Sequence, residues 1–234
     1  MNYICESGED KFLNENFFKN KKNGFFIDIG AHSGIWESKS LFFERDLEWD
    51  GVCVEPSPVN FSKLVENRKC KCLNIALSDK EEIVDFCVYD YINNGNVLTG
   101  DVVDGVIDGI LKNYSDSSRK EALQFSRIPQ KAMLANGVYK NRNVNIIKIK
   151  TYTFNNVFNY LQNQHIDFIN IDTEGSELPI LKGINFELFK IGFILFEKHC
   201  NNMDIELFLN QHGFTQIFCH FNNYIFQNKD QRKS

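Results

Sequence analysis

The sequence predicts an α/β fold with a doubly wound, mostly parallel sheet, helices on both faces and one reversed strand near an edge. Short apolar runs alternate with helical patterns along most of the chain, and strands separated by helices pair in parallel through right-handed crossovers. The last two apolar runs, Phe214–His220 and Tyr224–Gln227, are joined too tightly for a crossover and must be antiparallel. The length of 234 residues fits one domain, 1–234, around one core.

The first half of the chain contains two predicted helices between predicted strands. The strands are short apolar runs bounded by turn residues, at Gly24–Ile29, Gly51–Glu55, Cys72–Leu77 and Ile83–Tyr89. Helical periodicity covers Ile35–Glu44 and Val59–Asn67. The second helix follows a proline-rich turn and is expected to pack Phe61, Leu64 and Val65 on one side.

Periodicity weakens between Tyr91 and Arg142, where Gly, Asn, Asp and Ser surround two helix-like pieces near Val102–Leu111 and Arg119–Phe125. We interpret this segment as an insertion or cap, because long, poorly patterned insertions beside strand ends often act as lids. The regular pattern then resumes. Strands are expected at Val144–Ile149, Phe168–Ile171 and Gly192–Glu197, and helices near Phe154–Leu161, Glu177–Leu181 and Ile205–Gln211.

Charge and hydropathy exclude several classes of partner. The net charge of −5 lacks the surplus of Lys and Arg that neutralises phosphates, so nucleic acid is not expected as a partner. There is no long apolar run and no signal-peptide pattern near the N-terminus, so we expect a soluble, cytoplasmic protein with no membrane span.

The surplus of Asn, Lys and Phe is typical of an A/T-rich genome, such as that of a parasite or large virus.

The seven cysteines follow neither a CxxC pattern nor the spacing of a zinc site. Several lie in or beside strand-like runs, where a free cysteine behaves as a small buried hydrophobe. We therefore expect buried, reduced thiols.

A glycine turn follows the first strand in the motif Asp28-Ile-Gly-Ala-His-Ser-Gly34. Such a turn lets the backbone approach a ligand closely, and the expected helix offers free N–H groups to anionic atoms. The glycine spacing excludes the NAD fingerprint. S-adenosylmethionine, with its ammonium, sulfonium and carboxylate, fits a turn that begins with an acid, although a purely structural turn is the alternative.

Glu55 ends the second strand, 21 residues after Gly34. An acidic side chain at this place accepts hydrogen bonds from both hydroxyls of an adenosine ribose. The alternative is a solvated acid at a strand end.

The third motif, Asn170-Ile-Asp-Thr-Glu-Gly175, ends an apolar strand with two closely spaced carboxylates. Strand side chains alternate, so Asn170 and Asp172 share one face, and Glu174 follows just beyond. Carboxylates here suit a general base, a ligand anchor or a metal ligand, because they are costly to bury without a partner. A helix cap is the structural alternative.

Together these segments resemble the FkbM-type S-adenosylmethionine-dependent methyltransferases. The matching stretches keep the family's order and spacing and are Asn23–Gly34, Trp49–Pro58 with Phe61 and Leu64, Ile166–Leu178, and Leu181–Gly183. The resemblance implies a Rossmann-like class I methyltransferase sheet of seven strands with an antiparallel last strand. It also implies S-adenosylmethionine as cofactor and leaves open whether a divalent metal is needed.

The resemblance also assigns roles by position. It implies a cofactor site formed by Asp28, Gly30, Ala31, His32, Gly34, Glu55, Pro56, Ser57, Ala76, Leu77 and Ser78. Asp172 and Glu174 correspond to a pair near the transferred methyl group. With His199 they are the candidates to take a proton from an acceptor hydroxyl, although a single histidine after a strand is also common as a structural residue. We expect O-methylation of a small molecule or glycan.

Three departures from the family pattern keep a second interpretation open. Glu6 replaces a usual glutamine, Lys39 stands within Ser-Lys-Ser where Ser-Asn-Thr is common, and Lys198 separates a usual Glu-His pair. These changes suggest the alternative of a non-catalytic binding or interaction module with the methyltransferase fold.

Overall fold

The computed structural model describes residues 2–93, 96–99, 108–114, 116, 119–120, 142–198 and 203–230. Its main sheet contains seven strands: β1 (Phe25–Ile29), β2 (Asp50–Val54), β3 (Lys71–Leu73), β9 (His165–Ile171), β10 (Lys190–Glu197), β11 (Phe214–His220) and β12 (Asn223–Asn228). Their order is β11-β12-β10-β9-β1-β2-β3, and β12 runs antiparallel to both of its neighbours. The predicted mostly parallel, seven-stranded sheet with a reversed last strand is confirmed.

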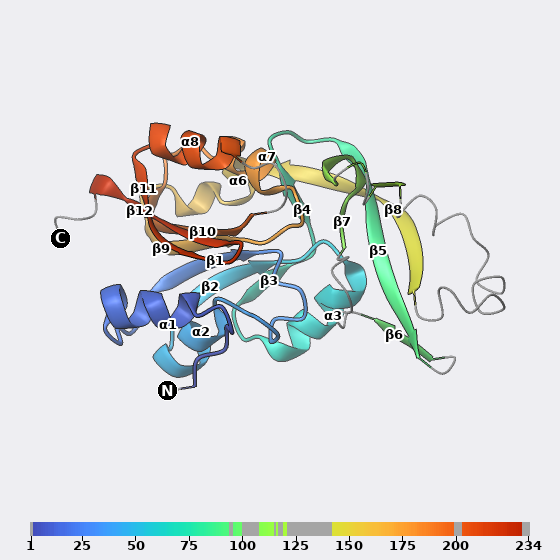
Figure 1. Cartoon of the computed structure of the whole chain (residues 1–234), viewed down its shortest axis with the longest axis horizontal. Helices are drawn as coiled ribbons and strands as arrows, with labels where there is room; N and C mark the ends of the chain where they lie inside the picture. The colour runs from blue at the N-terminus through green and yellow to red at the C-terminus, as the bar shows by residue number, and fades with distance from the viewer. Residues whose placement is uncertain are drawn as a thin grey trace.

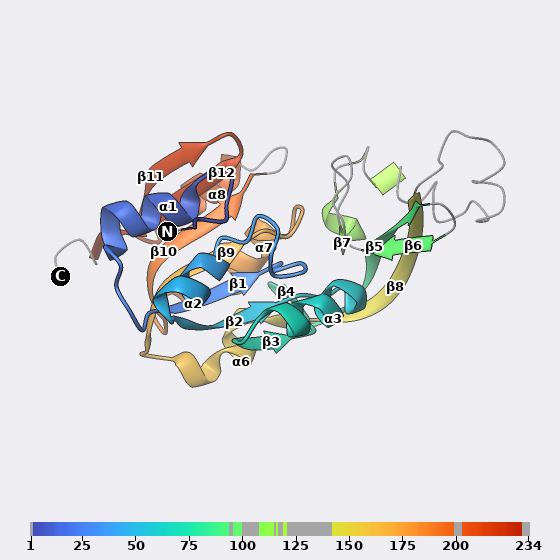
Figure 2. The ribbon, with the colours of Figure 1, turned by 90° about the horizontal axis from the view of Figure 1, so that it is seen from below.

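Helices cover both faces of this sheet (Figures 1 and 2). One face carries α1 (Glu9–Leu13), α2 (Leu41–Leu47) and α3 (Pro58–Asn67), and the other carries α6 (Phe154–Val157), α7 (Glu177–Lys182) and α8 (Met203–Gln211). Strand alternation divides the core between them. Phe26 and Phe168 pack in the cluster that holds Leu64 of α3, whereas Ile27 and Ile29 pack in the cluster that holds residues of α7 and α8.

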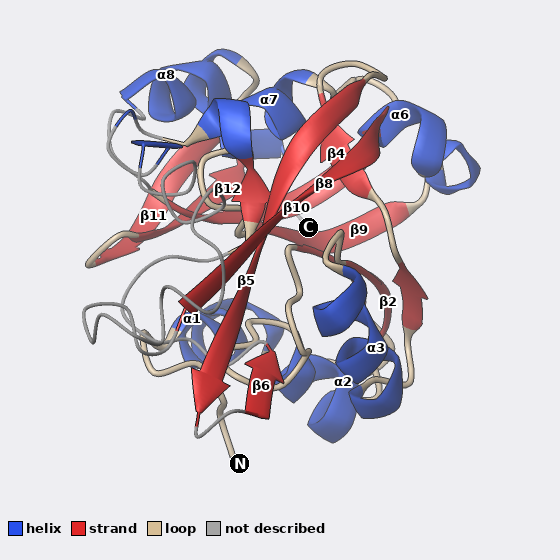
Figure 3. Ribbon diagram, turned by 90° about the vertical axis from the view of Figure 1, so that its right-hand side faces the viewer, coloured by secondary structure: helices blue, strands red, loops and turns tan. Residues whose placement is uncertain are grey.

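A second sheet of five strands adjoins the first (Figures 1 and 3). It consists of β4 (Ala76–Ser78), β5 (Ile83–Asn93), β6 (Asn96–Thr99), β7 (Gly109–Ile110) and β8 (Arg142–Thr153). The long antiparallel pair of β5 and β8 forms its body, and β7 pairs with Phe86 and Cys87 of β5. The sequence predicted parts of β5 and β8 as strands but not the sheet that they build.

The predicted helix near Val102–Leu111 is wrong at its end, because Gly109–Ile110 is strand β7 and a single 3-10 turn, Leu111–Asn113, follows. Two glycines in this stretch favour extended or turn backbone over a helix. The rest of this predicted piece, and most of the predicted Arg119–Phe125 helix, lie outside the described residues.

The helix predicted over Ile35–Glu44 begins only at Leu41. The preceding residues form turns in which Glu37 has a positive φ of 49°. Lys39 and Ser40 point their polar groups at the carboxylates of Asp172 and Asp28. These contacts hold the segment in a loop against the helical periodicity of its sequence.

Two further predictions are corrected. The strand expected at Cys72–Leu77 is split into β3 and β4, which belong to different sheets. The break falls at Asn74, whose side-chain amide donates to the carbonyls of Glu55 (2.8 Å) and Pro56 (3.1 Å). In α3, Leu64 is buried as expected, but Val65 is 51% exposed because it falls on the solvent side of the helix.

The N-terminal segment folds onto the main sheet although its sequence is polar. α1 continues into a π-helical turn, Asn14–Phe18, which buries Phe18, and α1 itself buries Leu13. The buried carboxylate of Asp10 accepts the backbone N–H groups of Ile4 (2.7 Å) and Cys5 (3.3 Å). No helix in the described part of the chain is long and apolar enough to cross a membrane.

Candidate functional site

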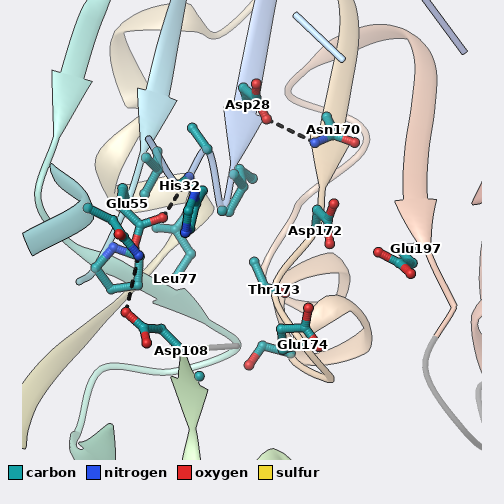
Figure 4. Close-up of a pocket in the computed structure, with 18 of the residues that line it drawn as sticks. Asp28, His32, Glu55, Leu77, Asp108, Asn170, Asp172, Thr173, Glu174 and Glu197 are labelled. Atoms are coloured by element: carbon teal, nitrogen blue, oxygen red, sulfur yellow. Dashed lines mark hydrogen bonds between the residues drawn. The ribbon is translucent and has the colours of Figure 1, made fainter. Parts of the chain in front are cut away.

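The carboxyl ends of β1, β2 and β9 open onto a cavity of about 280 Å³ (Figure 4). Ten of the predicted site residues line it: Asp28, Gly30, Ala31, His32, Glu55, Pro56, Ala76, Leu77, Asp172 and Glu174. The other three predicted cofactor residues, Gly34, Ser57 and Ser78, are not among its lining residues. His199 lies outside the described residues. The structure therefore brings together residues that the sequence separates by more than a hundred positions.

Gly30 lets the end of β1 lie directly against the end of β9. Its φ is +83°, and a Cβ atom there would stand 1.8 Å from the carbonyl oxygen of Asp172. The backbone N–H of Asp172 donates to the carbonyl of Ile29 at 2.9 Å. Only glycine combines this φ with this close approach, so the turn fixes Asp172 at the floor of the cavity.

Glu55 is held by the two turns that flank the cavity. Its Oε2 accepts the N–H of His32 and its Oε1 accepts the N–H of Ser57, both at 2.8 Å. Each oxygen keeps acceptor capacity for one more donor. Burial raises the pKa of Glu55 to about 8, against the lowering effect of these two N–H groups. The carboxyl group is therefore rigidly placed and readily changes protonation near neutral pH.

Asp28 anchors a buried polar network beneath the cavity. Its carboxylate accepts hydrogen bonds from Ser40 Oγ and from Asn170 Nδ2, the latter at 2.9 Å. The guanidinium of Arg68 lies 4.0 Å away. Asn170 also lines the cavity, and its Oδ1 is buried with no hydrogen-bond partner among the described residues. A buried acceptor of this kind calls for a donor group in the cavity.

Lys39 forms a nearly buried ion pair with Asp172. The Nζ–Oδ2 distance is 2.7 Å, and the side chains are 6% and 23% exposed. Burial disfavours the charged ammonium, but the Asp172 carboxylate outweighs that effect and raises the pKa of Lys39 above its usual range. The loop before α2 thus brings a permanent positive charge to the end of β9.

Three carboxyl groups meet at the same end of the cavity. Asp172, Glu174 and Glu197 each have an oxygen within 4.8 Å of the others. Burial, and then the charges of Asp172, Glu197 and Glu177, raise the pKa of Glu174 to about 9, so Glu174 is protonated at neutral pH. Oxygens at this spacing could hold a divalent cation, but the ammonium of Lys39 already neutralises Asp172.

The sequence did not single out most of the remaining lining residues. They include Ser7, Trp36, Glu37, Asn60, Phe86, Asp108, Ile110 and Asn223. Asp108 reaches the cavity because β7 pairs with β5, and Asn60 Nδ2 donates to its Oδ2 at 3.2 Å. Glu55 and Asp108 lie at one side of the cavity, and Asp172, Glu174 and Glu197 at the other (Figure 4). No local pattern marks Asp108 and Ile110, because long-range strand pairing places them.

Comparison with known proteins finds one matching family model and several similar solved structures. The model of the methyltransferase FkbM domain matches residues 28–215, whereas a search of curated proteins finds no match. Among solved structures, M. capricolum TrmK with S-adenosylhomocysteine is 11% identical, with a TM-score of 0.39 and coverage of 94% of this chain and 68% of that chain. The N-terminal domain of human METTL16 with S-adenosylhomocysteine is 12% identical, with a TM-score of 0.41. The match covers 93% of this chain and 65% of that chain.

A third solved structure, the precorrin-6y C5,15-methyltransferase of Geobacter metallireducens, is 12% identical, with a TM-score of 0.45 and coverage of 92% and 85%. The chain spans about two thirds of the length of the first two structures. The family match covers most of the chain, including the motifs at Asp28, Glu55 and Asp172. The chain therefore belongs to the FkbM family of S-adenosylmethionine-dependent methyltransferases.

Proposed function

We propose that this protein transfers a methyl group from S-adenosylmethionine to a hydroxyl of a small molecule or glycan. The observation that carries the proposal is the shared cavity at the strand ends. It holds a rigid acceptor for ribose hydroxyls, Glu55, at one side, and the acidic cluster of Asp172, Glu174 and Glu197 at the other.

The lining residues fit the chemistry of the cofactor. The two oxygens of Glu55 match the two ribose hydroxyls, and the buried Oδ1 of Asn170 matches a donor such as the cofactor's ammonium. Ala76 and Leu77 offer an apolar wall beside these groups, suited to adenine. When bound, S-adenosylmethionine supplies an electrophilic methyl group on a positively charged sulfur.

We assign the proton transfer to the acidic cluster. Asp172 would take the proton of the acceptor hydroxyl, with Lys39 holding its carboxylate in place through Oδ2. Protonated Glu174 donates a hydrogen bond that orients the acceptor. Positioning of this kind can contribute about 7–11 kcal/mol to lowering a barrier. His199 remains a predicted third participant.

The segment between Tyr91 and Arg142 belongs, in this proposal, to the acceptor side of a single domain. Support comes from its described part, because Asp108, Gly109 and Ile110 line the cavity. In the proposed arrangement, the acceptor therefore lies between the two sheets.

The test has two stages. Calorimetry should detect binding of S-adenosylmethionine and of S-adenosylhomocysteine to the purified protein. Absence of binding at millimolar ligand would overturn the proposal. The transfer of radiolabelled methyl groups to a panel of sugars, glycans and small alcohols should then occur with the wild type and fall at least tenfold with Asp172→Asn. Binding without transfer to any acceptor would instead favour the non-catalytic module, and transfer to amines alone would refute the hydroxyl acceptor.

A further inference from the structure

Three thiols gather on the α3 side of the main sheet, outside the cavity. Cys53 lies in β2, Cys72 lies in β3, and Cys70 immediately precedes β3. The Sγ atoms of Cys53 and Cys70 are 3.5 Å apart, and the Cα atoms of Cys53 and Cys72 are partners in the parallel register of β2 and β3. None of the three lines the cavity.

The described cysteines are free thiols, as the sequence predicted, but they differ in access to solvent. Cys53 is fully buried, Cys70 and Cys72 are half-buried, and Cys219 is exposed, against the expectation of burial. A small oxidant can therefore reach Cys72 from solvent, whereas Cys53 is reached only through its neighbours.

The cluster also polarises its thiols. A hydrogen bond from Cys53 and the nearby charge of Arg68 lower the pKa of Cys72 to about 7. Partial burial acts in the opposite direction but is outweighed. Hydrogen bonding with Cys70 and Cys72, followed by burial, raises the pKa of Cys53. The thiolate is the nucleophilic form of cysteine, so Cys72 is the sulfur poised to attack and Cys53 is a neutral thiol directly beside it.

We propose that Cys72 and Cys53 form a peroxide-oxidisable pair that closes a disulfide between β2 and β3. The Cys72 thiolate attacks one oxygen of a hydroperoxide, the O–O bond breaks, and Cys72 becomes a sulfenic acid while hydroxide (or alkoxide) leaves. The Cys53 sulfur then attacks the Cys72 sulfur, the S–O bond breaks, and water leaves with the Cys53 proton. Two electrons pass from the thiol pair to the peroxide.

The strand register makes this pairing accessible without rearrangement of the backbone. Paired strands lie about 4.8 Å apart, and disulfides form across Cα separations of roughly 4.4–6.8 Å. Cys53 and Cys72 stand opposite one another on β2 and β3, on the face that packs Phe26 and Leu64. Cys70, one residue before β3, has no strand partner and serves as the matched control.

The experiment treats the reduced, full-length protein with equimolar hydrogen peroxide and maps disulfides by peptide mass spectrometry. The expected product has lost two hydrogen atoms and contains a Cys53–Cys72 bridge. Cys70→Ser should keep this product, whereas Cys53→Ser should stop at a Cys72 sulfenic acid that dimedone traps, and Cys72→Ser should give neither. A Cys53–Cys70 bridge in the oxidised wild type, or loss of the Cys53–Cys72 bridge in Cys70→Ser, overturns the assignment.

A second measurement needs no variant. In the reduced wild type at pH 7, iodoacetamide should alkylate Cys72 several-fold faster than the more exposed Cys219, because the lowered pKa of Cys72 raises its thiolate fraction. Equal or slower alkylation of Cys72 would refute its role as the attacking sulfur, even if the variants failed to fold.

Discussion

At the scale of single residues, the site depends on side chains whose charge is set by their surroundings. Burial raises the pKa of Glu55, while two backbone N–H groups hold its carboxyl group in place. Lys39 is charged despite burial because Asp172 is 2.7 Å away. Each group has the residue type expected of a surface position, but burial and a fixed partner give it a binding or positioning role.

Removal of the Glu55 carboxyl group should weaken cofactor binding. Glu55→Ala leaves the ribose hydroxyls without their acceptor, so S-adenosylhomocysteine affinity should fall by about 1–3 kcal/mol. Isothermal calorimetry measures the change, and Glu66→Ala, at an exposed position of α3, is the matched control. Unchanged affinity in Glu55→Ala would remove Glu55 from the site.

The Lys39–Asp172 pair should contribute measurably to stability. Lys39→Met keeps the aliphatic chain but removes the ammonium partner of the partly buried Asp172 carboxylate, and the free energy of unfolding should fall by about 1–3 kcal/mol. The exposed pair of Lys22 and Glu48 provides the control, because Lys22→Met should cost under about 1 kcal/mol.

Urea unfolding of these variants and of Lys39→Met in an Asp172→Asn background gives the coupling energy. The loss should be smaller in that background, since the uncompensated charge is already gone. An equal loss in both backgrounds would mean that Lys39 acts through packing alone.

At the scale of elements, the site exists because β1 and β9 end side by side. The turn after β1 carries Gly30, whose missing side chain makes room for the Asp172 carbonyl. The loop from Ile35 to Ser40 stays unwound and places Lys39 and Ser40 over the same strand ends. The shape of the cavity floor therefore depends on the close approach of two backbone segments at Gly30 and Asp172, and not on a particular side chain.

Gly30→Ala should be far more costly than the same change at another glycine of similar conformation. Gly30 and Gly213 have φ values of +83° and +84°, but a Cβ at Gly213 meets nothing within 4 Å. Gly213→Ala should therefore cost only about 1–2 kcal/mol, from left-handed strain. Gly30→Ala adds the clash and should exceed about 4 kcal/mol or prevent folding.

Chemical unfolding of the two glycine variants measures this difference. If both lost the same stability, the close contact between β1 and β9 would have no energetic role.

At the scale of the whole molecule, two sheets share one cavity. The strand ends of the seven-stranded sheet supply Asp28, Glu55 and Asp172. The smaller sheet supplies Ala76 and Leu77 through β4, and Asp108 and Ile110 through β7. Buried acids on both sides of the cavity, Glu55 and Glu174, are protonated in the folded protein at pH values where unfolded chains ionise them. At these two groups, the folded state therefore binds more protons than the unfolded state between the ordinary pKa of 4.5 and the raised values of about 8 and about 9.

The stability of the ligand-free protein should fall as the pH rises. The pKa of Glu55 is raised from 4.5 to about 8, so its stabilising effect is complete below pH 4.5 and is lost as the pH rises to about 8. Glu174 acts in the same direction up to about pH 9. Thermal unfolding between pH 5 and pH 9 measures the slope.

Glu55→Gln, which cannot ionise, should flatten that slope, whereas Glu66→Gln at an exposed site should leave it unchanged. A slope that persists in full in Glu55→Gln would show that Glu55 is ionised in the folded protein.

The sequence by itself determined most strands of the main sheet, the antiparallel end and the family. An apolar run such as Phe25–Ile29 indicates a buried strand directly. The motifs at Asp28, Glu55 and Asp172 are each contiguous in the chain, so they can be recognised from the sequence alone. The tertiary structure alone decided that Lys39 meets Asp172 across 133 residues, that β7 brings Asp108 to the cavity, and that β3 and β4 separate at Asn74. Local periodicity specifies which face of an element is buried, whereas the choice of partner depends on long-range packing that no local pattern encodes.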